Sequence, residues 1–89
     1  MTRTFLILRP AQVMARAGLG NTAMHEAEAD ELLPRFFKIN GGRASGIFEH
    51  ELDAVLEARA AGATNDQIRE IVRRQVVQRK ARFDALKVA

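Results

Sequence analysis

Apolar side chains near the amino terminus recur at the intervals of a short amphipathic helix. An apolar lead-in over residues 5–8 comes first, and Pro10 then stands where the first turn of a helix tolerates proline. Val13 and Ala17 share one helical face, and Gly18 is a typical helix stop. The pattern predicts a first helix that begins at about Pro10 and ends before Gly18.

A second helix is expected after a connection of about three or four residues that contains glycine. Asn21 or Thr22 can cap its start, because both side chains accept hydrogen bonds from free backbone N–H groups. The apolar positions run toward Leu32, and Pro34 closes the helix. Two short helices at this spacing are typical of a helix-turn-helix unit.

Residues 35–48 change to a strand-like pattern around a turn. Phe36-Phe37 and Ile39 are strand formers, and Ile47-Phe48 suits a returning strand. Between them, Asn40-Gly41-Gly42 has the composition of a tight hairpin turn. The segment therefore predicts a small two-stranded hairpin.

Residues 49–61 return to helical spacing. Apolar residues recur from Leu52 onward, and Gly62 ends the pattern. Glu49 and Glu51 lie in the first turn, where negative charge suits the helix dipole. A third helix is expected here.

A fourth helix is expected from Asn65 to about Leu86. Thr64 and Gln67 fit a capping box, in which each side chain accepts a hydrogen bond from the other residue's backbone N–H. No proline or glycine interrupts the segment, so it can extend about 30 Å at 1.5 Å per residue. That is longer than a core of this size can cover, so part of the helix projects or packs against a second chain.

The fourth helix carries an apolar stripe and a basic stripe. The apolar positions are Ile68, Ile71, Val72, Val76, Phe83 and Leu86. The basic positions are Arg69, Arg73, Arg74, Arg79, Lys80 and Arg82. Such a helix can lie on a membrane surface, bind nucleic acid, or pack against its own core or a partner subunit. Packing is the favoured interpretation, and homodimerisation through this helix is a hypothesis.

Length and composition fit one small domain of 89 residues, with 47% hydrophobic and 28% charged residues. Residues 1–62 are expected to form its main unit, and residues 63–89 a basic amphipathic helix within the same compact unit. The chain has no cysteine, which excludes disulfides and thiolate sites. It lacks a bilayer-spanning apolar run and a cleavable leader pattern, so a cytoplasmic protein without a membrane partner is expected.

The residues that most often carry chemistry do not assemble into a site. His25 and His50 are the only histidines and lack the i, i+4 spacing of a zinc pair. No nucleophilic triad, phosphate-binding glycine loop or paired carboxylate cleft can be built from the sequence. We therefore expect no metal, cofactor, small-molecule substrate or enzymatic activity.

The order helix, turn, helix, hairpin, helix is that of a winged helix-turn-helix. Residues 5–59, about two thirds of the chain, also resemble the AlpA-like phage regulators and excisionases. The matching features are a lead-in strand, a second helix from about Asn21, and the segments Gln12-Val13-Met14-Ala15-Arg16-Ala17-Gly18-Leu19, Leu33-Pro34-Arg35, Lys38-Ile39, Gly41-Gly42-Arg43-Ala44, Gly46 and the third-helix residues Glu49, Glu51, Leu52, Asp53, Ala54, Leu56 and Glu57. The Gly-Gly-Arg turn followed at a fixed distance by an acidic helix start is the most specific part.

The resemblance implies a mainly α fold with a small β-hairpin: a winged helix-turn-helix of MerR-like or excisionase-like type plus a long carboxy-terminal helix. It also implies a protein that binds double-stranded DNA and regulates transcription or directs excision of a mobile element. The second helix would enter the major groove, with Thr22 and His25 facing the bases and Asn21 capping the helix or reaching a phosphate. The hairpin would supply the remaining DNA-binding residues, which are Arg35, Lys38, Asn40, Arg43 and Ser45.

The acidic character of the second helix favours a rival interpretation. Glu26, Glu28, Asp30 and Glu31 place negative charge in or just beyond the helix that should face phosphate. Residues 26 and 30 share one face while 28 and 31 lie on others, so not all four can point at a duplex. The alternative is a protein–protein interaction module that presents this helix to a basic partner and does not bind DNA.

Overall fold

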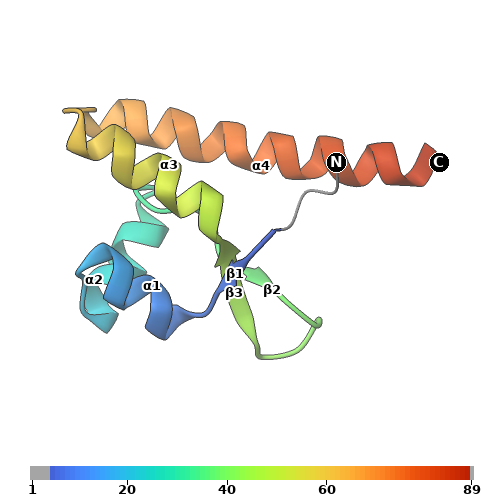
Figure 1. Cartoon of the computed structure of the whole chain (residues 1–89), viewed down its shortest axis with the longest axis horizontal. Helices are drawn as coiled ribbons and strands as arrows, with labels where there is room; N and C mark the ends of the chain where they lie inside the picture. Colours follow the sequence, from blue (N-terminus) through green and yellow to red (C-terminus); the bar gives the residue numbers. More distant parts are fainter. Residues whose placement is uncertain (1–4, 89) are drawn as a thin grey trace.

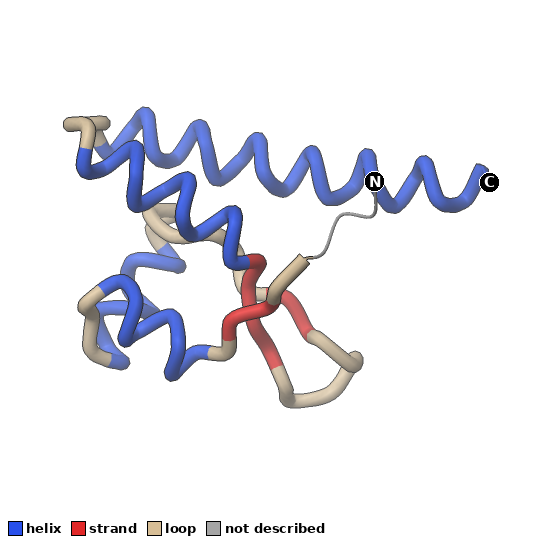
Figure 2. The backbone as a smooth tube through the Cα atoms, in the orientation of Figure 1, coloured by secondary structure: helices blue, strands red, loops and turns tan. Residues whose placement is uncertain are grey.

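The computed structural model describes residues 5–88. Within them the fold is mainly helical, with four helices and a small three-stranded antiparallel sheet (Figure 1 and Figure 2). The strands are β1 (Ile7–Leu8), β2 (Phe37–Lys38) and β3 (Ser45–Phe48). The helices are α1 (Pro10–Ala17), α2 (Asn21–Ala29), α3 (Glu49–Ala60) and α4 (Asn65–Val88). In Figure 1, α1, α2 and the β2–β3 hairpin lie below α3 and α4.

The first helix has the predicted bounds, but the predicted cap of the second helix is wrong. Pro10 begins α1, and the chain leaves it at Gly18 with φ 69°, a left-handed conformation that glycine adopts without a side-chain clash. Asn21 is already the first residue of α2, and Gly20 occupies the N-cap position. Neither Asn21 nor Thr22 caps the helix, because extended backbone at Gly20 (φ −78°, ψ 174°) precedes it and glycine is itself acceptable there.

The second helix ends at Ala29, earlier than the expected Leu32. The N–H of Leu32 donates to the carbonyl of Ala27 at 2.8 Å, and the N–H of Glu31 donates to the carbonyl of Glu28 at 3.1 Å. This is a Schellman turn, whose left-handed residue is usually glycine. Here that residue is Glu31, with φ 61°. A glutamate gives no sequence signal for a helix end, which explains the error.

The sheet contains three strands in the order β1-β3-β2. The residue pattern predicted the two strands of the hairpin, and the resemblance implied a lead-in strand without giving its partner. The β2–β3 hairpin is confirmed, and Phe37 lies opposite Gly46. The added strand is the apolar lead-in, in which Ile7 lies opposite Phe48 on β3. A pairing between segments so far apart in sequence has no turn signal to predict it.

Gly46 makes the close approach of β1 to β3 possible. A Cβ at this position would lie 2.6 Å from the carbonyl oxygen of Leu8 and 2.8 Å from Cγ2 of Ile7. We expect Gly46→Ala to lower the free energy of unfolding by about 1–3 kcal/mol, because the strands must separate to admit the methyl group. Urea denaturation measures this. Gly42→Ala at the exposed hairpin turn is the control: a Cβ there would meet only the end of the Asn40 side chain, at 3.2 Å from Oδ1, which can move without separating the strands. We expect a loss of less than about 1 kcal/mol, and equal losses in both variants would contradict the argument.

The last two helices follow the sequence closely. α3 ends one residue before the expected boundary, and Gly62 follows it with φ 96°. The capping box before α4 is confirmed: Gln67 N–H donates to Thr64 Oγ1 at 3.2 Å, and Thr64 N–H donates to Gln67 Oε1 at 2.8 Å. α4 has 24 residues, and its carboxy-terminal part extends beyond α3 (Figure 1).

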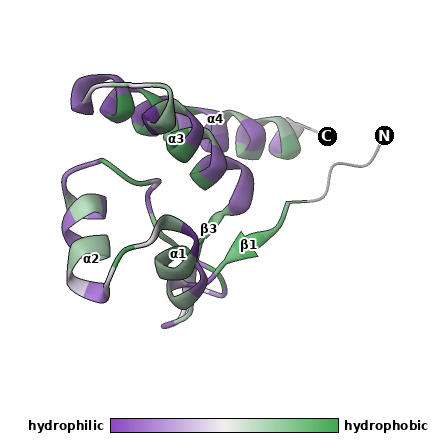
Figure 3. Ribbon diagram, turned by 60° about the vertical axis from the view of Figure 1, so that its left-hand side comes forward, coloured by the Kyte–Doolittle hydropathy of each residue, from purple (hydrophilic) through white to green (hydrophobic). Residues whose placement is uncertain are grey.

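Two apolar clusters hold these elements together. The larger joins α1, α2, the sheet and α3, and consists of Leu8, Val13, Met24, Leu33, Ile47 and Leu52. The smaller joins α3 to the first half of α4, and consists of Val55, Ile68 and Val72. In Figure 3, hydrophobic and hydrophilic residues alternate along α3 and α4, as expected for helices with one buried face. None of the helices in residues 5–88 is both long and apolar enough to cross a membrane.

Candidate nucleic-acid interface

The start of α2 is an exposed helix end with free backbone donors. Asn21, Thr22 and His25 are all exposed, while Met24 between them is buried and anchors the helix. Within the described structure no side chain caps this end, and its first turn contains no acidic residue. A helix N-terminus of this kind favours an anion, because its N–H groups and the helix dipole both point toward it.

The hairpin presents two cations, Lys38 at the end of β2 and Arg43 in the turn that follows. Lys38 and Arg43 are exposed, and neither forms an ion pair within residues 5–88. Asn40, which we expected to contact DNA, uses its side-chain oxygen to accept a hydrogen bond from Gly42 N–H at 3.0 Å. Gly41 beside it has φ 75°. The turn is thereby held in shape, with Lys38 and Arg43 on either side of it.

A hollow between α2 and the hairpin brings together three of the predicted site residues. His25, Lys38 and Ser45 line it, together with Pro10, Glu28 and two phenylalanines. Its volume is about 240 Å³. Ser45 is half-buried there, whereas His25 and Lys38 are exposed. The sequence thus identified residues from two separate elements that the fold places side by side.

Arg35 lies apart from this hollow and is engaged with α2. Its Nε lies 3.6 Å from Oε2 of Glu28, and the same carboxylate oxygen accepts a hydrogen bond from the N–H of Phe36 at 3.3 Å. The backbone carbonyl of Arg35 accepts from Arg79 on α4 at 2.9 Å. Arg35 therefore joins the base of the hairpin to α2 and to α4 and partly neutralises Glu28.

A second carboxylate of the acidic segment is also paired. Arg73 of α4 makes a two-pronged contact with Glu31, at 3.1 Å from Nη2 and 3.2 Å from Nε. This hydrogen-bonded ion pair lowers the pKa of the Glu31 carboxyl below its ordinary 4.5, and the positive charges of Arg35 and Arg69 act in the same direction. Glu26 and Asp30 are the two acidic residues of this segment that stay exposed.

Lowering the pH is expected to remove the Glu31 contribution. Because the folded-state pKa is depressed, the ion pair stabilises the fold at pH values above about 4.5 and is lost as the pH falls through the folded value. We therefore expect wild type to be more stable than Glu31→Gln at neutral pH, with the difference shrinking between about pH 5 and about pH 3. Urea unfolding of both proteins across this range measures it. A difference that stays constant with pH would show that the carboxylate charge is not involved.

Each of the six cations in the basic stripe of α4 has a carboxylate partner inside the molecule. Three of these ion pairs lie within α4: Arg69 with Asp66, Arg74 with Glu70, and Lys80 with Asp84. A fourth joins Arg73 to Glu31, which follows the end of α2. The other two, Arg79 and Arg82, both approach Glu51. These ion pairs neutralise carboxylates of the same molecule. The favoured interpretation of this helix, packing against the protein's own core, is confirmed for the first half of α4.

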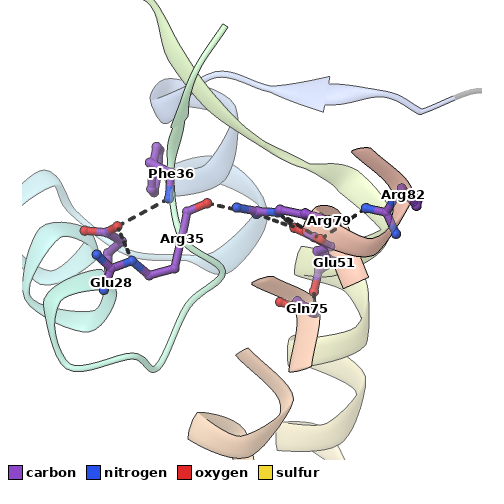
Figure 4. A network of polar contacts seen from close by, with 7 residues as sticks. All are labelled: Glu28, Arg35, Phe36, Glu51, Gln75, Arg79 and Arg82. Atoms are coloured by element: carbon purple, nitrogen blue, oxygen red, sulfur yellow. Dashed lines mark hydrogen bonds and ion pairs between the residues drawn. The ribbon is translucent and has the colours of Figure 1, made fainter. Parts of the chain in front are cut away.

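Glu51 lies in the first turn of α3, as predicted. The sequence did not indicate its second role: it is only 2% exposed and accepts hydrogen bonds from Arg79 through both carboxylate oxygens (Figure 4). Gln75 donates to its backbone carbonyl at 3.0 Å. The signal was its position: Glu51 lies one residue before Leu52 and four before Val55, on the buried face of α3.

No match was found when the chain was compared with models of known protein families, with curated proteins and with solved structures. The case for any function therefore rests on the surface just described. His50 lies elsewhere, against the rings of Phe5 and Phe48 at 5.1 and 5.5 Å. Within residues 5–88 no group of three or more histidine, aspartate and glutamate side chains is placed to hold a metal ion.

Proposed function

We propose that this chain is a winged helix-turn-helix protein that binds double-stranded DNA, as a transcriptional regulator or an excision factor of the AlpA-like type. α2 enters the major groove, and the β2–β3 hairpin acts as the wing on the adjacent backbone. The role requires no cofactor and no catalysis, and it places the protein in the compartment that holds the DNA.

One observation carries the proposal: Lys38 lies beside His25 of α2, neither Lys38 nor Arg43 has an ion pair within residues 5–88, and the exposed, uncapped first turn of α2 contains no carboxylate. The acidic residues that argue against DNA binding lie after the first turn of α2. Glu28 and Glu31 are each paired with an arginine, Arg35 and Arg73 respectively. The surface offered to a duplex is therefore more positive than the sequence of α2 suggests.

In this arrangement the side chains have separate tasks. The N–H groups at Asn21 and Thr22 bind a phosphate, and Lys38 and Arg43 bind phosphates on the far side of the groove. Thr22 and His25, one turn apart on α2, contact base edges. Phosphate contacts set the register, and the two base-facing residues select the sequence.

Fluorescence anisotropy with a labelled mixed-sequence duplex tests the proposal at a low and a moderate salt concentration. We expect binding at low salt that weakens steeply as salt is added, because each neutralised phosphate contributes about 0.9 to the slope of log K against log salt. Selection from a randomised duplex pool then gives the preferred sequence. Thr22→Ala and His25→Ala should change that preference, whereas Arg43→Ala should weaken binding to all sequences alike.

We also propose that two copies pair through the carboxy-terminal half of α4. Phe83 and Leu86 are 56% and 74% exposed there, and with Phe37 and Phe48 they line a mostly apolar groove of about 540 Å³. Pairing would let two α2 helices bind neighbouring half-sites, so that the second contact becomes intramolecular. Sedimentation equilibrium should show a dimer that Leu86→Asp converts to monomer. A wild-type chain that stays monomeric at high concentration would rule out this pairing.

The interaction-module alternative is supported by Glu26 and Asp30, which stay exposed on α2. In that case α2 binds a basic protein surface, and no duplex binds even at low salt. The anisotropy experiment therefore decides between the two functions.

A further inference from the structure

The segment that joins α2 to the hairpin is tied to α4 at both of its ends. We call residues 30–36 the connector. At its start, Arg69 Nε donates to the backbone carbonyl of Asp30 at 3.0 Å. At its end, Arg79 Nη2 donates to the backbone carbonyl of Arg35 at 2.9 Å. The two elements of the proposed DNA surface are therefore joined by a segment whose ends a third helix holds.

Between these contacts, Arg73 holds the residue with the least favourable backbone conformation. Glu31 adopts φ 61°, a left-handed conformation that side chains with a Cβ rarely take. Both oxygens of its carboxylate accept hydrogen bonds from Arg73. A planar guanidinium bound at two points fixes the direction of the carboxylate as well as its distance, so the turn that ends α2 has a defined orientation on α4.

Arg79 extends the same attachment to the hairpin. Its guanidinium carbon lies 5.2 Å from the ring centre of Phe37, the first residue of β2. Leu32 of the connector packs against the cluster that contains Ile68 and Val72 of α4. The end of α2, the connector and the start of β2 thus all contact one face of α4 (Figure 4 shows the Arg79 end).

We propose that Arg69, Arg73 and Arg79 are positioning residues of the DNA-binding surface, which set the angle and spacing between α2 and the hairpin. The inference rests on the proposed function and deepens it, because it gives α4 a part in recognition without contact to DNA. α2 and the hairpin must contact the same duplex at the same time. A change in the spacing between these two elements therefore weakens both the base contacts of α2 and the phosphate contacts of the hairpin.

Two adjacent arginines of α4 provide a matched test. Arg73 and Arg74 have side chains that are 65% and 64% exposed, and each forms one ion pair. Arg73 reaches Glu31 in the connector, whereas Arg74 reaches Glu70 on α4 itself. Arg73→Ala and Arg74→Ala therefore remove the same charge from adjacent positions of α4, and only the first releases the connector.

Binding to the duplex selected by wild type is the first readout. We expect Arg73→Ala to weaken it by between about threefold and thirtyfold, and Arg74→Ala by less than twofold. The slope of log K against log salt should stay at the wild-type value in Arg73→Ala, because no phosphate contact is lost. The charge-exchanged protein, Glu31→Arg with Arg73→Glu, should regain most of the affinity. A slope lower by about 0.9 in Arg73→Ala would show that Arg73 binds a phosphate, and the positioning role would be wrong.

Amide hydrogen exchange in the free protein is the second readout and needs no DNA. Arg73→Ala should exchange faster than wild type over residues 27–38, with α3 unchanged, and Arg74→Ala should match wild type throughout. Unchanged exchange over residues 27–38 in Arg73→Ala would overturn the proposal. If no protein binds a duplex, the proposed function fails, and the exchange result alone decides whether α4 holds α2 and the hairpin in place.

Discussion

Replacing Glu51 with alanine is expected to lower the free energy of unfolding by about 3–5 kcal/mol. The side chain is 2% exposed and binds Arg79 through both oxygens. Its removal leaves Arg79, whose side chain is only 17% exposed, without its carboxylate partner. An unpaired charge in such a place is strongly unfavourable. Of the substitutions considered, this one should have the largest effect on stability. Urea denaturation monitored by circular dichroism measures it.

Glu57→Ala on the same helix is the matched control. Glu57 is exposed and has no ion pair within the described residues, so its loss should change stability by no more than about 0.5 kcal/mol. Replacing both members of the pair, with Glu51→Met and Arg79→Met, should recover much of the loss, because buried apolar side chains need no partner. Equal effects of Glu51→Ala and Glu57→Ala would show that the buried pair contributes nothing.

Removing Lys38 and Arg43 together is expected to have the largest effect on DNA binding. If each binds one phosphate, the double alanine variant should reduce the slope of log K against log salt by about 1.8, from 0.9 for each contact. Affinity at low salt should fall for every duplex alike, because neither side chain reads a base. Anisotropy titrations over a series of salt concentrations give both quantities.

The matched control removes two cations of α4 that are paired within the molecule. Arg74→Ala with Lys80→Ala changes the net charge by the same amount, but these side chains face Glu70 and Asp84. We expect a slope close to that of wild type. If the two double variants weaken binding equally, attraction by overall charge explains the affinity, and the hairpin has no special role.

Local signals in the sequence predicted most helix boundaries, because the residues that start and stop helices act on their neighbours. Pro10, Gly18 and the Thr64–Gln67 capping box fall where the helices begin or end. The end of α2 was predicted too late in the sequence, because no local signal marks it. Glu31 takes the left-handed conformation usually held by glycine, and its contact is with Arg73, which lies 42 residues later in α4.

The part of the candidate site that depends on local features was also predicted from the sequence. The exposed start of α2 and the glycine-rich turn are local features, so Thr22, His25, Lys38 and Arg43 could be named from the chain alone. The sequence could not show which charged side chains remain without an ion pair, because ion pairs depend on how the chain folds. The six cations of the basic stripe of α4 form the most basic segment of the sequence, yet every one has a carboxylate partner. The pairing of β1 with β3 was likewise a long-range event.

The most direct test is to add a short duplex to ¹⁵N-labelled protein at low salt and to follow the amide resonances. The account predicts that the perturbed amides cluster at residues 20–25 of α2 and residues 38–45 of the hairpin, with those of the carboxy-terminal half of α4 unchanged. A spectrum that does not respond to DNA, or one in which the changes are confined to α4, would contradict it.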